Sequence, residues 1–145
     1  MYPFFLDLHN LLRWLVLAAG AAALVAAWAG VIAGGKWSPR LGGISRLFVI
    51  AIDLQVLVGL VLFVVLSPVT RAALRDLGAA MRSGEIRFIV VEHFVLMLAA
   101  AVLAHVGAAR GKAKDSALQA ATCYTLAALA LAFGTPWGRR LLPWL

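Results

Sequence analysis

Ionisable side chains interrupt segments of this sequence that are otherwise apolar, and these side chains are the first candidates for chemistry. They belong to six residues: His9, Arg13, Asp53, Glu92, His93 and His105. An ionisable group inside a membrane span costs roughly 2.5–3.5 kcal/mol on insertion scales, so each is expected to have a partner or a function. The fourth apolar segment has none and offers only Thr122, Cys123, Tyr124 and Thr125.

The spacing places His9 and His93 at the same depth. Each lies about five residues inside its apolar segment, or roughly 7–8 Å at 1.5 Å per residue, and both segments run in the same direction. One imidazole from each of two helices is an arrangement that suits the iron of a b-type haem. Arg13, one turn deeper on the face of His9, would balance a haem propionate. Glu92 would accept a hydrogen bond from a ligating histidine.

The same residues also fit simpler interpretations. His9 would then be an interfacial side chain, and His93 would be the hydrogen-bond partner of Glu92 or Arg13. Met97 follows His93 by four residues, and a thioether beside an imidazole is also a pattern that binds copper.

Asp53 and His105 form a second polar layer, about 18 Å from the first along the third apolar segment. Carboxylate–imidazole pairs in membranes serve proton or quinone chemistry. The alternative is a hydrogen bond that joins two helices, worth roughly 0.6 kcal/mol on average.

The composition defines the elements that must position these residues. The chain has 145 residues, of which 64% are hydrophobic and 13% charged, whereas soluble domains average about 45–50% apolar and 25% charged. One cysteine excludes an intrachain disulfide framework. We therefore expect an all-α fold, an integral membrane four-helix bundle that forms a single transmembrane domain over residues 1–145. The expected spans are 5–33, 48–66, 88–109 and 117–134, each close to the 17–25 residues that a bilayer requires.

Residues 68–83 predict a short interfacial amphipathic helix between the second and third spans. Ser67 followed by Pro68 is a helix-start signature, and Gly84 is expected to end the helix. One helix face carries apolar residues and the other carries arginines, which would meet lipid phosphates. These residues are Leu74, Leu77 and Met81 on the first face, and Arg71, Arg75 and Arg82 on the second.

The net charge of +7 indicates anionic lipids as partners and not nucleic acid, because no extramembrane segment is long enough to carry a nucleic-acid-binding face. Basic residues are equally numerous at the two ends of the bundle. The loops after the first and third spans are shorter and denser in charge, which favours their placement in the cytoplasm and the termini in the periplasm. Tryptophans and arginines near the carboxyl end are expected to anchor in the headgroup region: Trp137, Arg139, Arg140 and Trp144.

Several short motifs resemble a group of small bacterial four-span membrane proteins often labelled cytochrome b-like. They are LHNLLRW at 8–14, DLQVLVGL at 53–60 leading to Ser67-Pro68, Arg87-Phe88 with Glu92-His93 and Met97, and Pro136-Trp137. The resemblance covers nearly the whole chain. It implies a location in the bacterial inner membrane and His9 and His93 as the haem ligands. Well-understood four-helix cytochromes b draw histidines from more helices, so this sequence favours one haem and not two.

Two functions follow from these observations. The first is a membrane-embedded cytochrome b-like electron-transfer protein that carries one haem b between His9 and His93 and exchanges electrons with quinol or a partner protein. The second is a non-catalytic structural subunit of a larger respiratory or photosynthetic complex, which the short loops and the lack of an extramembrane catalytic domain favour. The expected partners are the lipid bilayer and either such a complex or a second copy of the chain.

Overall fold

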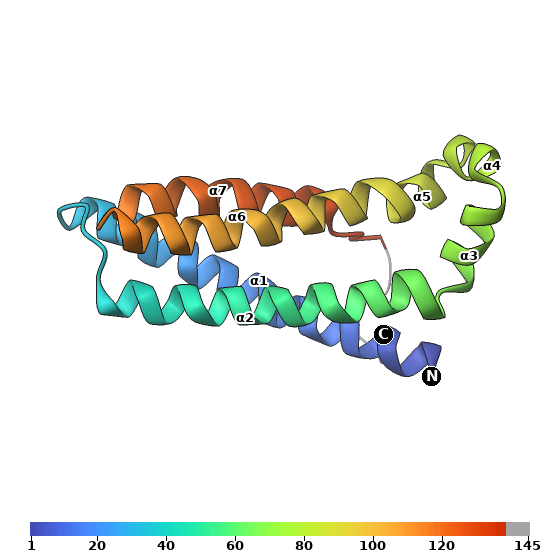
Figure 1. Cartoon of the computed structure of the whole chain (residues 1–145), viewed down its shortest axis with the longest axis horizontal. Coiled ribbons are helices and arrows are strands. Elements are labelled where there is room, and N and C mark those ends of the chain that lie inside the picture. Colours follow the sequence, from blue (N-terminus) through green and yellow to red (C-terminus); the bar gives the residue numbers. More distant parts are fainter. Residues whose placement is uncertain (139–145) are drawn as a thin grey trace.

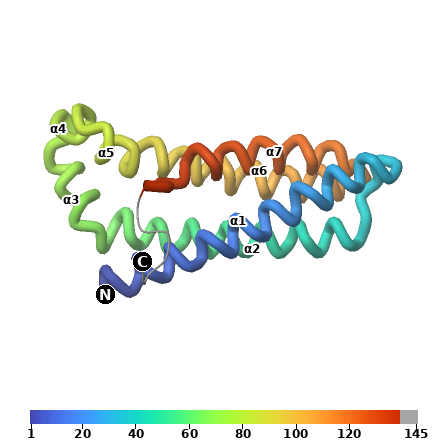
Figure 2. Tube along the Cα trace, turned by 180° about the vertical axis from the view of Figure 1, so that it is seen from behind, coloured from blue at the N-terminus to red at the C-terminus, as the bar shows by residue number. Residues whose placement is uncertain are grey.

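The computed structural model describes residues 1–138 as a bundle of helices, and that range contains no β-strand. The long helices are α1 (Tyr2–Ile32), α2 (Pro39–Val61), α6 (Phe94–Ala113) and α7 (Ala117–Gly134). They lie side by side, as Figures 1 and 2 show from opposite directions. The expected all-α bundle is therefore confirmed.

Two of the long helices are extended by π-helical turns. η1 (Leu62–Leu66) continues α2, and η2 (Phe88–His93) precedes α6. Three short helices connect them at one end of the bundle (Figure 1): α3 (Pro68–Arg75), α4 (Leu77–Arg82) and α5 (Gly84–Arg87). The α1–α2 pair diverges from α6 and α7 toward this same end (Figures 1 and 2).

Within residues 1–138, four helices are long and apolar enough to cross a membrane: Tyr2–Ile32, Pro39–Leu66, Gly84–Ala113 and Ala117–Gly134. This is the organisation of a multi-pass membrane protein. The helix of the second expected span begins at Pro39 instead of residue 48, because the Ser38 hydroxyl accepts a hydrogen bond from the Leu41 amide at 3.1 Å and Pro39 fits the first turn. Apolar runs thus mark only the central part of each helix, which continues into polar residues.

The connection after η1 differs in part from the expected single helix over 68–83. Ser67 does begin a helix, since its hydroxyl accepts a hydrogen bond from the Thr70 amide at 3.2 Å. The helix then breaks at Asp76, whose carboxylate accepts a hydrogen bond from the Ala79 amide at 2.8 Å and so begins α4. Gly84 begins α5 and does not end a helix. Contact of this connection with the lipid interface stays a prediction.

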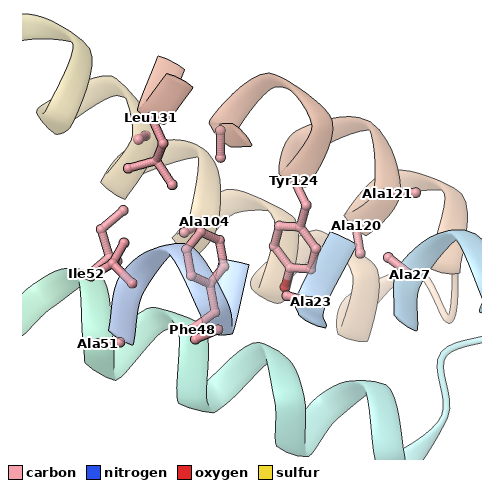
Figure 3. Close-up of a cluster of buried hydrophobic side chains, with 14 of the residues drawn as sticks. Ala23, Ala27, Phe48, Ala51, Ile52, Ala104, Ala120, Ala121, Tyr124 and Leu131 are labelled. Carbon is pink, nitrogen blue, oxygen red and sulfur yellow. The ribbon is translucent and has the colours of Figure 1, made fainter. Parts of the chain in front are cut away.

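Small side chains fill the places where the long helices meet. Alanines are fully buried on α1, α6 and α7, and Figure 3 shows several of them around the largest buried rings. Those rings belong to Phe48 and Tyr124, which meet edge to face with centroids 5.7 Å apart. In lipid, helix association depends on van der Waals contact and not on the hydrophobic effect. Small residues at these contacts therefore stabilise the bundle by letting the backbones approach.

The loops at the end opposite α3 are joined to each other. The Trp37 amide donates to the Asp115 carboxylate at 3.1 Å, and the Ala117 amide donates to the Gly35 carbonyl at 2.8 Å. Gly35 has a φ of 77°, a left-handed conformation that glycine adopts without steric cost. The Trp37 ring packs against Gly111, where a Cβ would lie 2.5 Å from a ring carbon. This end of the bundle is therefore closed by direct contacts.

The described chain ends just after α7. The Trp137 indole donates to the Ala132 carbonyl at 2.8 Å and half of its surface is exposed, which suits the expected anchoring role. The other expected anchors, Arg139, Arg140 and Trp144, lie outside the described residues.

Replacing Gly107 by alanine is expected to destabilise the bundle. A Cβ there would lie 2.7 Å from a Tyr124 ring carbon and 2.9 Å from the Cys123 Cβ. Such overpacking costs about 1–3 kcal/mol, so the melting temperature in detergent, followed by circular dichroism, should fall. Gly43→Ala is the matched control, because nothing lies within 4 Å of a Cβ at that position. Equal melting temperatures for the two variants would contradict this account of helix packing.

Candidate functional site

A cavity of about 650 Å³ lies at the end of the bundle where α1 and α2 diverge from α6 and α7. Residues of all four long helices line it, together with residues of η1, η2 and α3. Most of the lining is apolar. The polar side chains that face it include His9, Arg13, Gln55 and His93.

The structure brings His9 and His93 together across this cavity. Their ring centroids are 6.2 Å apart, and the ring planes cross at 75°. His9 comes from the first turns of α1, and His93 ends η2 at the start of the third span. Both helices run in the same direction from this end of the bundle, as the sequence indicates (Figure 1).

The carbonyl oxygen of Gly134 holds the His93 ring, at 2.7 Å from the ring nitrogen Nδ1. Because a carbonyl only accepts, Nδ1 carries a proton, and in the neutral imidazole Nε2 then keeps its lone pair. Gly134 also permits this approach of α7 to α6, since a Cβ at that position would lie 2.5 Å from the Met97 methyl carbon. His93 therefore presents Nε2 as a potential ligand, with the other nitrogen fixed in the way that is usual for metal-binding histidines.

The side-chain amide of Gln55 holds the His9 ring, at 3.2 Å from Nε2. Gln55 is 7% exposed, and its Oε1 atom and His9 Nδ1 are buried without a hydrogen-bond partner in the described structure. An amide carries a donor and an acceptor at the same end, so a half-turn lets Gln55 accept a hydrogen bond from His9 Nε2. His9 Nδ1 then carries no proton, and it lies buried against α2, where a Cβ on Gly59 would be 3.6 Å away.

Gly59 makes room for the His9 ring beside α2. A Cβ on Gly59 would lie 3.1 Å from the Cε1 atom of His9, which is tighter than an ordinary van der Waals contact. The lack of a side chain at this position therefore lets α1 bring His9 close enough to α2 to reach Gln55.

Arg13 adds a buried positive charge to the cavity wall. It is 8% exposed and lies one helical turn from His9 on the same face of α1. Its guanidinium carbon is 5.8 Å from the centre of the Trp14 ring, a cation–π contact. A cation in this position favours an anionic group within the cavity.

The expectation that Glu92 would accept a hydrogen bond from a histidine is wrong. Its carboxylate pairs with the Arg87 side chain at 2.9 Å, and both side chains are about half exposed. The cause is the π-helical turn η2, in which residues five apart lie over each other, as Arg87 and Glu92 do. The Gly134 carbonyl takes the place that the sequence suggested for Glu92.

Asp53 and His105 meet as expected, but on the outside of the bundle. His105 Nε2 lies 2.8 Å from Asp53 Oδ1, and the side chains are 53% and 51% exposed. The pair joins α2 to α6, and neither residue lines the cavity. It forms a site separate from that of His9 and His93.

Sequence reasoning did not assign roles to Gln55 and Gly134. Gln55 carries a visible signal, since it is a polar side chain in an apolar segment. Gly134 carries no signal that distinguishes it from the other glycines of the chain. Gly59 is one of the glycines that the sequence suggests leave room for close helix approach. The copper alternative stays a prediction, and its three residues, His9, His93 and Met97, all line the cavity.

No family model, curated protein or solved structure matches this chain. The function is therefore inferred from the geometry of the two polar sites.

His93 is expected to be a neutral imidazole protonated at Nδ1, because its partner is a carbonyl oxygen. Nitrogen NMR of protein labelled at the three histidines should show this tautomer for the signal that is lost in His93→Gln. The control variant His105→Asn removes a half-exposed ring and should leave the His93 signal unchanged. A His93 signal of the Nε2-protonated tautomer would contradict the assigned hydrogen bond.

Proposed function

We propose that this chain carries electrons within the membrane and that His9 and His93 would hold one haem b in the cavity. The supporting observation is the pairing of two imidazoles from separate helices that face one cavity, each held at one ring nitrogen by a group from a third or fourth helix. The nitrogens without an assigned hydrogen bond are His9 Nδ1 and His93 Nε2, and both kinds of ring nitrogen serve as metal ligands. Because His9 Nδ1 lies against Gly59, binding through it would require the His9 ring to turn toward the cavity.

The separation of the rings supports a metal centre between them. Metal–imidazole bonds are about 2 Å long, so the ring centres of two imidazoles that would hold one ion lie at most about 6 Å apart. The observed distance between the ring centres is 6.2 Å. His9 and His93 are therefore close enough to hold one metal centre together.

The size and lining of the cavity also support a cofactor. Cofactor sites are typically mostly apolar clefts of about 300–1,000 Å³ with a few polar groups, and this cavity has a volume of about 650 Å³. Arg13 would pair with a haem propionate, while the Gln55 amide and the Gly134 carbonyl would keep the two imidazoles in position. A haem so held supplies a one-electron carrier.

Quinol or a partner protein would exchange electrons with this site. A second cavity of about 60 Å³ adjoins His9 and His93 and is lined by Leu60 and Leu98. These leucines are 38% and 36% exposed on α2 and α6, so the site comes close to the outer surface between the two helices.

We also propose the bacterial inner membrane as the location, with the termini in the periplasm. Basic residues cluster in the short loops at the closed end and in the helix ends beside them, and loops rich in such residues usually face the cytoplasm. They are Lys36, Arg40, Arg110, Lys112 and Lys114. At the other end, the exposed Arg75 and Arg82 would lie among anionic headgroups.

The haem proposal predicts the optical spectrum of the purified protein. A Soret band that shifts on reduction with dithionite should be present, and it should be lost in His9→Ala and in His93→Ala. His105→Ala and Glu92→Gln are the matched controls and should retain the band, because both residues lie outside the cavity lining. A colourless protein that copurifies with a larger complex would overturn this proposal and favour the structural-subunit function.

Arg13→Gln should retain the band but lower the midpoint potential. A buried cation near the site favours the reduced state, which carries one positive charge fewer, so its loss favours the oxidised state. Arg87→Gln is the control, since it removes a half-exposed arginine outside the cavity lining. Redox titration measures the midpoint potential of both variants. An equal fall of the midpoint potential in Arg13→Gln and Arg87→Gln would show that Arg13 has no specific electrostatic effect on the cofactor.

A further inference from the structure

We propose that the outer face of α2 and α6 binds a second copy of this chain, with the Asp53–His105 pair at the centre of a two-fold interface. This inference does not depend on haem, because neither residue lines the cavity. Asp53 and His105 lie within two helices that are long and apolar enough to cross a membrane.

The pair is half exposed on a surface that is otherwise apolar. Asp53 lies midway along the span Pro39–Leu66, and its side chain is 51% exposed. Its exposed neighbours are aliphatic: Ile50, Leu57 and Val102 are 51%, 60% and 60% exposed. Ionisable side chains within spans normally face a bundle interior or a water-filled cavity, because contact with lipid is costly. The exposed half of this pair is therefore expected to contact another protein surface and not lipid.

The other outward faces do not share this feature. Between Leu11 and Ile32 of α1, and along the whole of α7, the exposed positions hold no Asp, Glu, Lys, Arg or His within the described residues. Their large exposed side chains, such as Val25 and Leu129, are apolar and suited to lipid contact. The outward faces of α1 from Leu11 and of α7 therefore do not need to contact protein, whereas the α2–α6 face does.

The exposed residues of this face form two straight seams. On α2 they recur at alternating intervals of four and three residues, and on α6 they do the same. The seams are Arg46, Ile50, Asp53, Leu57 and Leu60 on α2, and Val95, Leu98, Val102, His105 and Ala109 on α6. Seams of this period allow membrane helices to pack at small crossing angles along their length.

Charge complementarity identifies the occupant as a second copy. In the ion-paired form, His105 Nε2 donates to Asp53 Oδ1, which leaves one donor, His105 Nδ1, and one acceptor, Asp53 Oδ2. A two-fold axis brings the same patch of two subunits together, so the patch must be complementary to itself. Here His105 Nδ1 would donate to the partner's Asp53, and the reciprocal bond would complete a ring of four charged groups.

Cross-linking of single-cysteine variants tests the interface. In a Cys123→Ala background, which removes the one native cysteine, Leu57→Cys lies on the proposed face and Leu129→Cys on α7. The two native leucines are 60% and 49% exposed, so both positions are accessible. A bis-maleimide added to membranes that contain the full chain should give a covalent dimer with Leu57→Cys and not with Leu129→Cys. Equal cross-linking of the two would overturn the proposal.

The polar contact is tested by variants of the pair in the Leu57→Cys chain. Asp53→Leu with His105→Leu keeps an apolar surface but removes the self-complementary charges, so the dimer band should be lost. The exchange of the two residues, Asp53→His with His105→Asp, keeps one donor and one acceptor and should retain the band. A double-leucine variant that cross-links as well as its parent would contradict the assigned contact.

Two further results distinguish a second copy from a different partner protein, and the dimer from the haem site. Mass spectrometry that identifies a different protein in the Leu57→Cys product would overturn the second copy as occupant and assign the face to a mixed complex. The His9→Ala variant should retain the dimer band even when it lacks a Soret band, so failure of the haem proposal leaves this inference intact. Loss of the dimer in that variant, with the melting temperature unchanged, would contradict the independence of the two sites.

Discussion

Close contact between helices at one end of the bundle is the constraint on which the cavity depends. Buried alanines and glycines let α1, α2, α6 and α7 approach where the Trp37 and Asp115 loops meet. At the opposite end of the described residues, α1 and α2 diverge from α6 and α7 (Figure 2), and the Phe63 ring of η1 stacks on the Phe94 ring of α6 at 4.6 Å. The space between the helices at that end becomes a cavity of about 650 Å³. The imidazoles face this space because they lie on turns that the tight packing does not reach.

A single helix supplies both polar sites. Gln55 and Asp53 are two residues apart on α2, so their side chains point in nearly opposite directions, about 200° apart around the helix axis. Gln55 turns inward to His9, whereas Asp53 turns outward to His105. The burial of the first and the exposure of the second follow from this geometry, since a membrane helix in a small bundle has only one inward face.

The sequence was sufficient to predict the class of the fold and the meeting of His9 with His93. The class follows from composition, and the meeting follows from helix rise and chain direction, which are both local properties. Gln55 and Gly134 were not assigned because their partners lie 46 and 41 residues away, and their roles exist only after the helices pack. Glu92 was assigned wrongly because a π-helical turn changes which residues share a face. Asp76 divided the expected 68–83 helix because its capping contact competes with helix continuation.

The two π-helical turns give the second and third spans a property that uniform α-helices lack. Each turn holds one residue more than an α-helical turn would, so the side chains on its two sides follow different rotational phases. In the third span, the directions of the side chains before η2 are thus independent of the directions of the side chains that pack α6 against α7. Substitutions or single-residue deletions at the open end can therefore re-aim side chains there while the seam between α6 and α7 stays in register, which makes the cavity end the more adaptable half of this molecule.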